Sequence, residues 1–109
     1  MNKSNTGIPG GARPADIGVL RQAIDKIDEK ILNLINQRLS LAKQIGNLKK
    51  QGGIQIKDSG REKEILNRLQ EKNTGPLDND GLRNIFNAII AEGRNVQRPG
   101  SSVKGRKQK

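Results

Sequence analysis

The residue whose position first suggests chemistry is Arg38, which interrupts a run of apolar residues spaced four and three apart. Lys49 follows it by 11 residues. On a helix these two long cationic side chains share one face, about 16 Å apart along the axis, and could converge on a small anion. A charge desolvated without a partner on an apolar stripe costs on the order of several kcal/mol. An ion pair, or a side chain that reaches solvent, is the alternative explanation.

Two further polar residues could complete such a site. Arg21 precedes Arg38 by 17 residues, about 25 Å on a helix, so the two cannot reach one small ligand within a single chain. If two such helices pair antiparallel across a twofold axis, Arg21 of one chain reaches the site of the other. Gln97 follows Ile90 by seven residues and lies on the same apolar stripe, although a solvated helix end explains it equally well.

The composition excludes several classes of active site. The chain has 109 residues without Cys, His, Trp or Tyr and with one Phe. Zinc sites, iron–sulfur sites, cysteine nucleophiles and Ser-His-Asp triads need thiolate or imidazole groups, so we expect neither a metal nor a cofactor. No segment approaches the ~20 apolar residues of a membrane span, and no apolar signal core is present. We expect a cytoplasmic protein without a membrane partner.

The net charge of +10 falls mainly at the two ends of the chain. Residues 1–15 and 98–109 are rich in Asn, Ser, Gly, Pro and Lys, a composition that predicts disordered segments around a helical domain at 16–97. The basic tail is interpreted as a solubilising extension or a linker, with a phosphate-binding arm as the alternative. With one aromatic residue there is no platform for stacking bases, so we expect no nucleic-acid partner.

The elements that must position these residues are three helices. The first is expected over residues 17–51, with Asp16 as its N-cap and Gly52-Gly53 as its stop. Its apolar positions are Leu20, Ile24, Ile27, Ile31, Leu34, Leu41, Ile45 and Leu48. At about 50 Å it is too long for a core of radius ~13 Å, which favours a partner chain as cover.

The second and third helices are shorter. Ser59 to Glu62 has the form of a capping box that opens the second helix, and residues 73–76 end it. Asp78 or Asn79 caps a third helix that ends near Gln97. No alternating strand pattern is present, so the fold class is all-α with one long helix and two shorter ones.

These residues together resemble a known family, the all-helical class of chorismate mutase. The matching positions are Leu20-Arg21, Ile24, Ile27-Asp28, Leu34, Arg38, Ile45, Lys49, Asp58, Arg61-Glu62, Phe86, Ile89-Ile90 and Gln97. The resemblance implies an intertwined homodimer with two equivalent sites. It also implies the Claisen rearrangement of chorismate to prephenate, a step of aromatic amino acid biosynthesis.

The resemblance further implies a role for each polar residue. Arg21 would reach into the partner's site, whereas Arg38, Lys49, Asp58, Arg61, Glu62 and Gln97 would come from the site's own chain. The arginines would hold the two carboxylates of chorismate, and Lys49 and Gln97 would face its ether oxygen. Glu62 and the backbone near Asp58 would bind the ring hydroxyl. A pericyclic step transfers no proton and uses no nucleophile, which agrees with a chain lacking His and Cys.

Three other interpretations stay open. A related scaffold serves as an isochorismate pyruvate-lyase, but that variant lacks an acidic residue matching Glu62. The domain could instead be a regulatory helical module of a shikimate-pathway enzyme, with the basic tail as the linker to that partner. A nucleic-acid binder would explain the basic ends but not Arg38, Lys49 and Gln97. Gly93 stands where the family often has a larger residue, and we expect it to loosen the last turn before Gln97.

Overall fold

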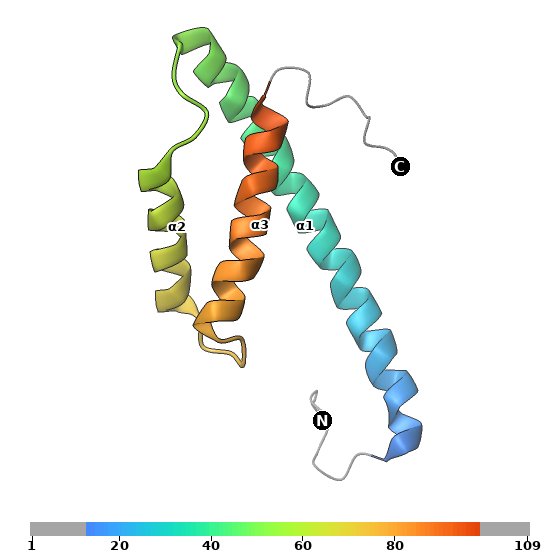
Figure 1. Ribbon diagram of the computed structural model, residues 1–109. Helices are drawn as coiled ribbons and strands as arrows, with labels where there is room; N and C mark the ends of the chain where they lie inside the picture. The colour runs from blue at the N-terminus through green and yellow to red at the C-terminus, as the bar shows by residue number, and fades with distance from the viewer. Residues whose placement is uncertain (1–12, 99–109) are drawn as a thin grey trace. The chain divides into compact units, whose positions relative to one another are not determined.

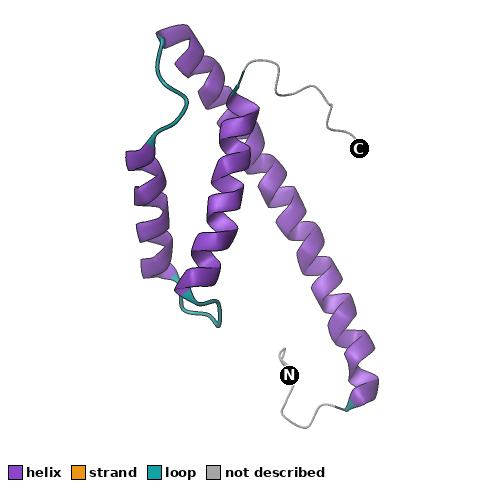
Figure 2. Ribbon diagram, in the orientation of Figure 1, coloured by secondary structure: helices purple, strands orange, loops and turns teal. Residues whose placement is uncertain are grey.

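The computed structural model describes residues 13–98, which form helices joined by loops (Figures 1 and 2). The predicted all-α class is confirmed, since residues 13–98 contain three α-helices and no strand. Residues 1–12 and 99–109, where most of the predicted disorder falls, lie outside the described residues. The chain divides into two compact units, up to Leu34 and from Ile35. Across residues 13–98, no helix has the length and apolar character that crossing a membrane requires.

Helix α1 (Ile17–Gly52) has nearly the predicted bounds and follows a short 3-10 turn, Pro14–Asp16. It ends where Gly53 adopts a φ of 69°, a conformation that side chains with a Cβ rarely take. The backbone N–H of Ile54 then donates to the carbonyl of Lys49 at 2.8 Å. Asp16 differs from its predicted role, because its carboxylate turns back to accept from the backbone N–H of Arg13 at 2.8 Å.

The first unit contains the N-terminal half of α1, whose apolar side chains are exposed. Leu20 is half-buried, but the other large apolar residues keep between 45% and 61% of their surface accessible. These residues are Ile17, Val19, Ile24, Ile27, Ile31, Leu32 and Leu34. The expectation that a partner chain covers this stripe therefore stays a prediction.

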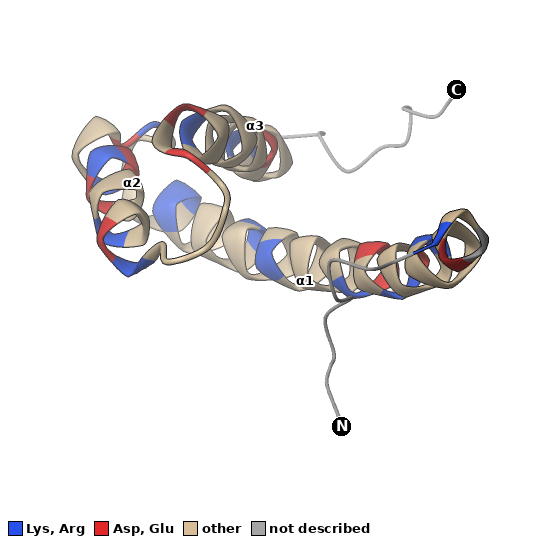
Figure 3. Cartoon of the chain, turned by 90° about the horizontal axis from the view of Figure 1, so that it is seen from below, with Lys and Arg blue, Asp and Glu red and all other residues tan. Residues whose placement is uncertain are grey.

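The second unit contains a small core contributed by all three helices. Its buried apolar residues are Ala42 of α1, Ile65 of α2 (Ser59–Lys72), and Leu82 and Ile90 of α3 (Asn79–Gln97). Helices α2 and α3 pack against each other and lie side by side in both ribbon views (Figures 1 and 3). This packing brings the start of α2 and the end of α3 to one side of the core.

The starts of α2 and α3 are fixed by aspartate caps. Asp58 accepts from the backbone N–H of Arg61 at 3.0 Å, so the N-cap is one residue earlier than the predicted Ser59. Both residue types are good caps, and the carboxylate gains additionally from the positive end of the helix dipole. Asp78 caps α3 by accepting from Gly81 at 2.7 Å, which confirms one of the two predicted caps. Acidic and basic residues are interspersed along α2 (Figure 3).

Candidate active site

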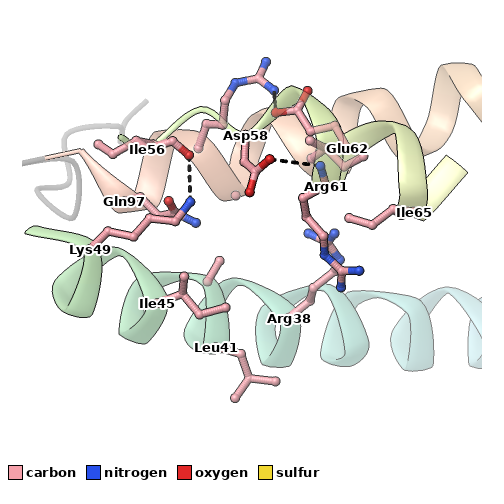
Figure 4. Close-up of a pocket in the computed structure, with 14 residues that line it drawn as sticks. Arg38, Leu41, Ile45, Lys49, Ile56, Asp58, Arg61, Glu62, Ile65 and Gln97 are labelled. Carbon is pink, nitrogen blue, oxygen red and sulfur yellow. Dashed lines mark hydrogen bonds and ion pairs between the residues drawn. The ribbon is translucent and has the colours of Figure 1, made fainter. Parts of the chain in front are cut away.

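A cavity of about 290 Å³ lies in the second unit between α1, the start of α2 and the end of α3 (Figure 4). Its polar lining residues are Arg38, Lys49, Asp58, Arg61, Glu62, Arg94 and Gln97. The structure thus brings together every predicted site residue except Arg21. Apolar side chains complete the wall, among them Leu41, Ile45 and Ile65. Such a wall lowers the local dielectric and strengthens the interactions that the charged groups make.

Arg38 is half-buried on the α1 side of this cavity, and Arg61 reaches toward it from α2 (Figure 4). Burial lowers the pKa of the Arg38 guanidinium, and the positive charge of Arg61 lowers it further. Among the residues that the structure describes, no carboxylate lies within ion-pair distance of Arg38, whereas Arg61 pairs with the exposed Glu64 at 2.7 Å. Within the described residues, the two guanidinium groups thus have a single carboxylate partner, that of Glu64. One positive charge is left for an external anion to balance.

Lys49 is held by the main chain rather than by another side chain. Its Nζ donates to the carbonyl oxygen of Ile56 at 2.9 Å, in the loop between α1 and α2 (Figure 4). An ammonium group has three donors, so two remain for a ligand. The turn at Gly53 returns the chain toward α1 and makes this contact possible.

Gln97, the last residue of α3, lies directly on α1. A Cβ built at the buried Gly46 would stand 2.7 Å from Gln97 Cγ and 2.9 Å from its Cα, so only glycine allows this approach. The Gln97 Oε1 atom is buried and accepts no hydrogen bond within residues 13–98. Sequence reasoning missed Gly46, although a glycine inside a helix costs about 1 kcal/mol and calls for a packing reason.

The acidic side of the cavity differs from the expected capping box. The Asp58 carboxylate is used as the cap of α2, so its side chain is already bonded. Glu62 turns away from the helix start and accepts from Arg94 Nη1 at 2.7 Å. Arg94 is a second residue that sequence reasoning missed. The sequence feature that could have identified it is its position on the same helical face as two other lining residues, four residues after Ile90 and three before Gln97.

Arg21 is an exposed residue of the first unit and does not line the cavity of the second unit, as its distance from Arg38 along the helix predicted. Its contribution to the site of a partner subunit stays a prediction. Gly93 does not loosen α3, which stays helical through it to Gln97. It is buried, and a Cβ there would meet Arg38 Nη1 at 3.5 Å and Ala42 Cβ at 3.8 Å, which are ordinary contacts.

The sequence as a whole was compared with known families. The model of chorismate mutase type II matches residues 20–98, which include α2, α3, all but the first three residues of α1, and the whole cavity. The chain belongs to the chorismate mutase type II family. It is 41% identical over 81 residues to the chorismate mutase of Methanocaldococcus jannaschii, covering 72% of this chain and 81% of that protein.

Larger relatives carry a second activity beside the chorismate mutase. The bifunctional chorismate mutase/prephenate dehydratase of Neisseria gonorrhoeae is 39% identical over 79 residues, which are 72% of this chain. This chain spans 21% of the length of that relative. A solved structure, a conserved hypothetical protein from Pyrococcus furiosus, aligns with a TM-score of 0.65 and 36% identity, covering 80% of this chain and all of that one.

Proposed function

We propose that this chain catalyses the rearrangement of chorismate to prephenate in the cavity of the second unit. The observation that carries the proposal is the placement of Arg38. It is half-buried beside Arg61 without a carboxylate partner among the described residues, in a chain of the chorismate mutase type II family. A dianionic substrate would supply the missing countercharge, so binding would relieve the repulsion between the two guanidinium groups.

Each polar residue would contact the part of the substrate that lies at its end of the cavity. Arg38 and Arg61 hold carboxylate groups and select the folded, reactive conformer of the substrate. Lys49 and Gln97 lie at the other end of the cavity and donate to the ether oxygen, where negative charge grows as the C–O bond lengthens. The hydrogen bond from Lys49 to the Ile56 carbonyl supports this role, because a donor fixed in advance needs no reorganisation during the reaction. The Glu62 carboxylate accepts a hydrogen bond from the ring hydroxyl, and the backbone at Asp58 donates one to it.

The proposal includes a homodimer in which each site is completed by Arg21 of the partner subunit. The exposed apolar stripe on the N-terminal half of α1 supports it, since a second copy of the same stripe would cover that surface. Arg21 does not line the cavity of its own chain, which leaves it available to another. The bifunctional relatives further support, as a proposal, a second enzyme of the same pathway as partner through the basic tail.

The direct test of the activity is turnover of chorismate by the purified chain with the product identified. We expect prephenate, formed at a saturable rate far above the spontaneous one, and loss of that rate in Arg38→Ala. Formation of pyruvate would instead indicate the lyase. A folded protein without turnover would contradict an enzymatic role and favour the regulatory module.

The shared site has its own test, in which two inactive variants are mixed. Arg21→Ala and Arg38→Ala homodimers each lack one group in both sites. A mixed dimer has one site with both arginines, so after subunit exchange about a quarter of the sites should be intact. Recovery of that activity supports the shared site, and no recovery despite proven exchange contradicts it.

A further inference from the structure

An ion pair within the cavity joins two residues that are 32 positions apart in the sequence. Arg94 Nη1 on α3 donates to Glu62 Oε2 on α2 at 2.7 Å. Both side chains line the cavity and keep about a quarter of their surface, 25% for Arg94 and 22% for Glu62. A charge-assisted hydrogen bond in such a half-buried place is stronger than an exposed ion pair.

The two oxygens of Glu62 are in different situations. Oε2 is bound by Arg94, whereas Oε1 has only a 3.7 Å contact with Lys57 Nζ in the part of the chain that the structure describes. Lys57 keeps 62% of its side-chain surface exposed, so solvent weakens that contact. Oε1 is therefore the oxygen that remains free to accept a hydrogen bond from a ligand.

Glu62 also lies in a cavity that offers it other cations. Arg38 and Arg61 line the same space, and an unrestrained carboxylate would be drawn toward them. Glu62 would then leave its place and neutralise the groups that are to hold the substrate carboxylates. A rigid, planar guanidinium on the opposite side fixes the carboxylate where it is.

We propose that Arg94 is a positioning residue that holds Glu62 as the acceptor for the ring hydroxyl of the substrate. This inference rests on the proposed function, because it assumes that Glu62 meets that hydroxyl. The side-chain partner that the structure gives for the Arg94 guanidinium is Glu62, through Nη1. The pair thereby sets the preference of the site for substrates with a hydroxyl at that ring position.

The test compares chorismate with an analogue that lacks the ring hydroxyl, on the full chain. The preference is the kcat/KM for chorismate divided by the kcat/KM for the analogue. If the analogue does not react, the preference is the inhibition constant of the analogue divided by the Michaelis constant of chorismate. We expect Arg94→Gln to lower this ratio about tenfold, mainly through weaker binding of chorismate. Arg94→Lys, which keeps a donor and the charge, should restore part of it.

The matched control is Arg83→Gln on the same helix. Arg83 forms an exposed pair with Asp80 and does not line the cavity, so the same charge change there should leave the ratio unaltered. Adding Arg94→Gln to Glu62→Gln should cause no further fall in the ratio, because the group that Arg94 positions is already gone. Circular dichroism and thermal unfolding confirm that each variant is folded.

The outcomes separate this inference from the proposed function. If Glu62→Gln lowers the ratio but Arg94→Gln does not, or if Arg94→Gln slows both compounds equally, the inference is overturned while the activity stands. A ratio that Glu62→Gln leaves unchanged also overturns it. Absence of any chorismate turnover by the unsubstituted, folded chain would instead remove the proposed function itself.

Discussion

The two halves of α1 carry similar apolar spacing but different surroundings. In the N-terminal half, up to Leu34, the large apolar side chains are about half exposed, as with Ile24 at 54% and Ile27 at 53%. In the C-terminal half, Leu41, Ile45 and Leu48 keep a similar 49% to 65% of their surface, but Ala42 is buried and Gly46 lies against α3. Within residues 13–98, one half thus has an apolar stripe without cover, and the other half has polar residues that line a cavity. One helix can thus combine an exposed apolar stripe, which we propose as the surface for a second copy, with a wall of the candidate site.

The largest effect should come from the polar group at the centre of the second half. We expect Arg38→Ala to lower kcat/KM about a thousandfold, the loss of two charge-assisted hydrogen bonds to a carboxylate. The free energy of unfolding should change by less than about 1 kcal/mol, because removal of a half-buried, unpaired charge relieves desolvation. Steady-state kinetics and urea unfolding measure the two quantities. An unfolded variant would show that Arg38 serves the fold instead.

A charge on the uncovered stripe should have the next largest effect. If two copies associate through this stripe, as proposed, Ile27→Asp buries a carboxylate between them at a cost of roughly several kcal/mol. We expect a monomer by sedimentation equilibrium and about a hundredfold less activity at micromolar concentration. Asn33→Asp adds the same charge on the same helix outside the predicted apolar stripe and serves as control. A fully active Ile27→Asp dimer would remove the stripe from the interface.

Replacement of a glycine at the contact with α3 should have a smaller effect. Gly46→Ala puts a Cβ within 3 Å of Gln97 Cα, at 2.9 Å, so the end of α3 must shift away from position 46 of α1. We expect kcat to fall about tenfold while KM changes little, because the role proposed for Gln97 is to donate to the transition state. Rapid-quench or steady-state kinetics would detect the change. A Gly46→Ala enzyme with full kcat would mean that α3 can move without cost to Gln97.

The smallest effect should come from the same substitution in the first half of α1. A Cβ at Gly18 meets nothing within 4 Å, so Gly18→Ala gains helix propensity without a clash. We expect the free energy of unfolding to rise by about 0.5 to 1 kcal/mol with unchanged kinetics. Thermal or urea unfolding measures the gain. Destabilisation here would show that the first half is also in close contact with another surface.

The sequence predicted those features that depend on local rules. The ends of α1 at Gly52 and of α2 before Asn73 follow from glycine and turn signals, and Arg38 was visible because it interrupts an apolar stripe. Asp58 and Ser59 are adjacent good caps, so the sequence could not decide between them. It gave no direct indication that Glu62 bonds with Arg94, because that contact depends on how α2 and α3 pack.

The hydrogen bond between Lys49 and the Ile56 carbonyl bears on how this site tolerates mutation. A carbonyl belongs to the peptide backbone, so drift at position 56 changes the side chain there without deleting the acceptor. The partner of Glu62 is a side chain, and one codon change at position 94 removes it. The contact that holds Lys49, the proposed donor to the ether oxygen, is thus buffered against mutation, whereas the contact that holds Glu62, the proposed acceptor for the ring hydroxyl, is open to evolutionary change.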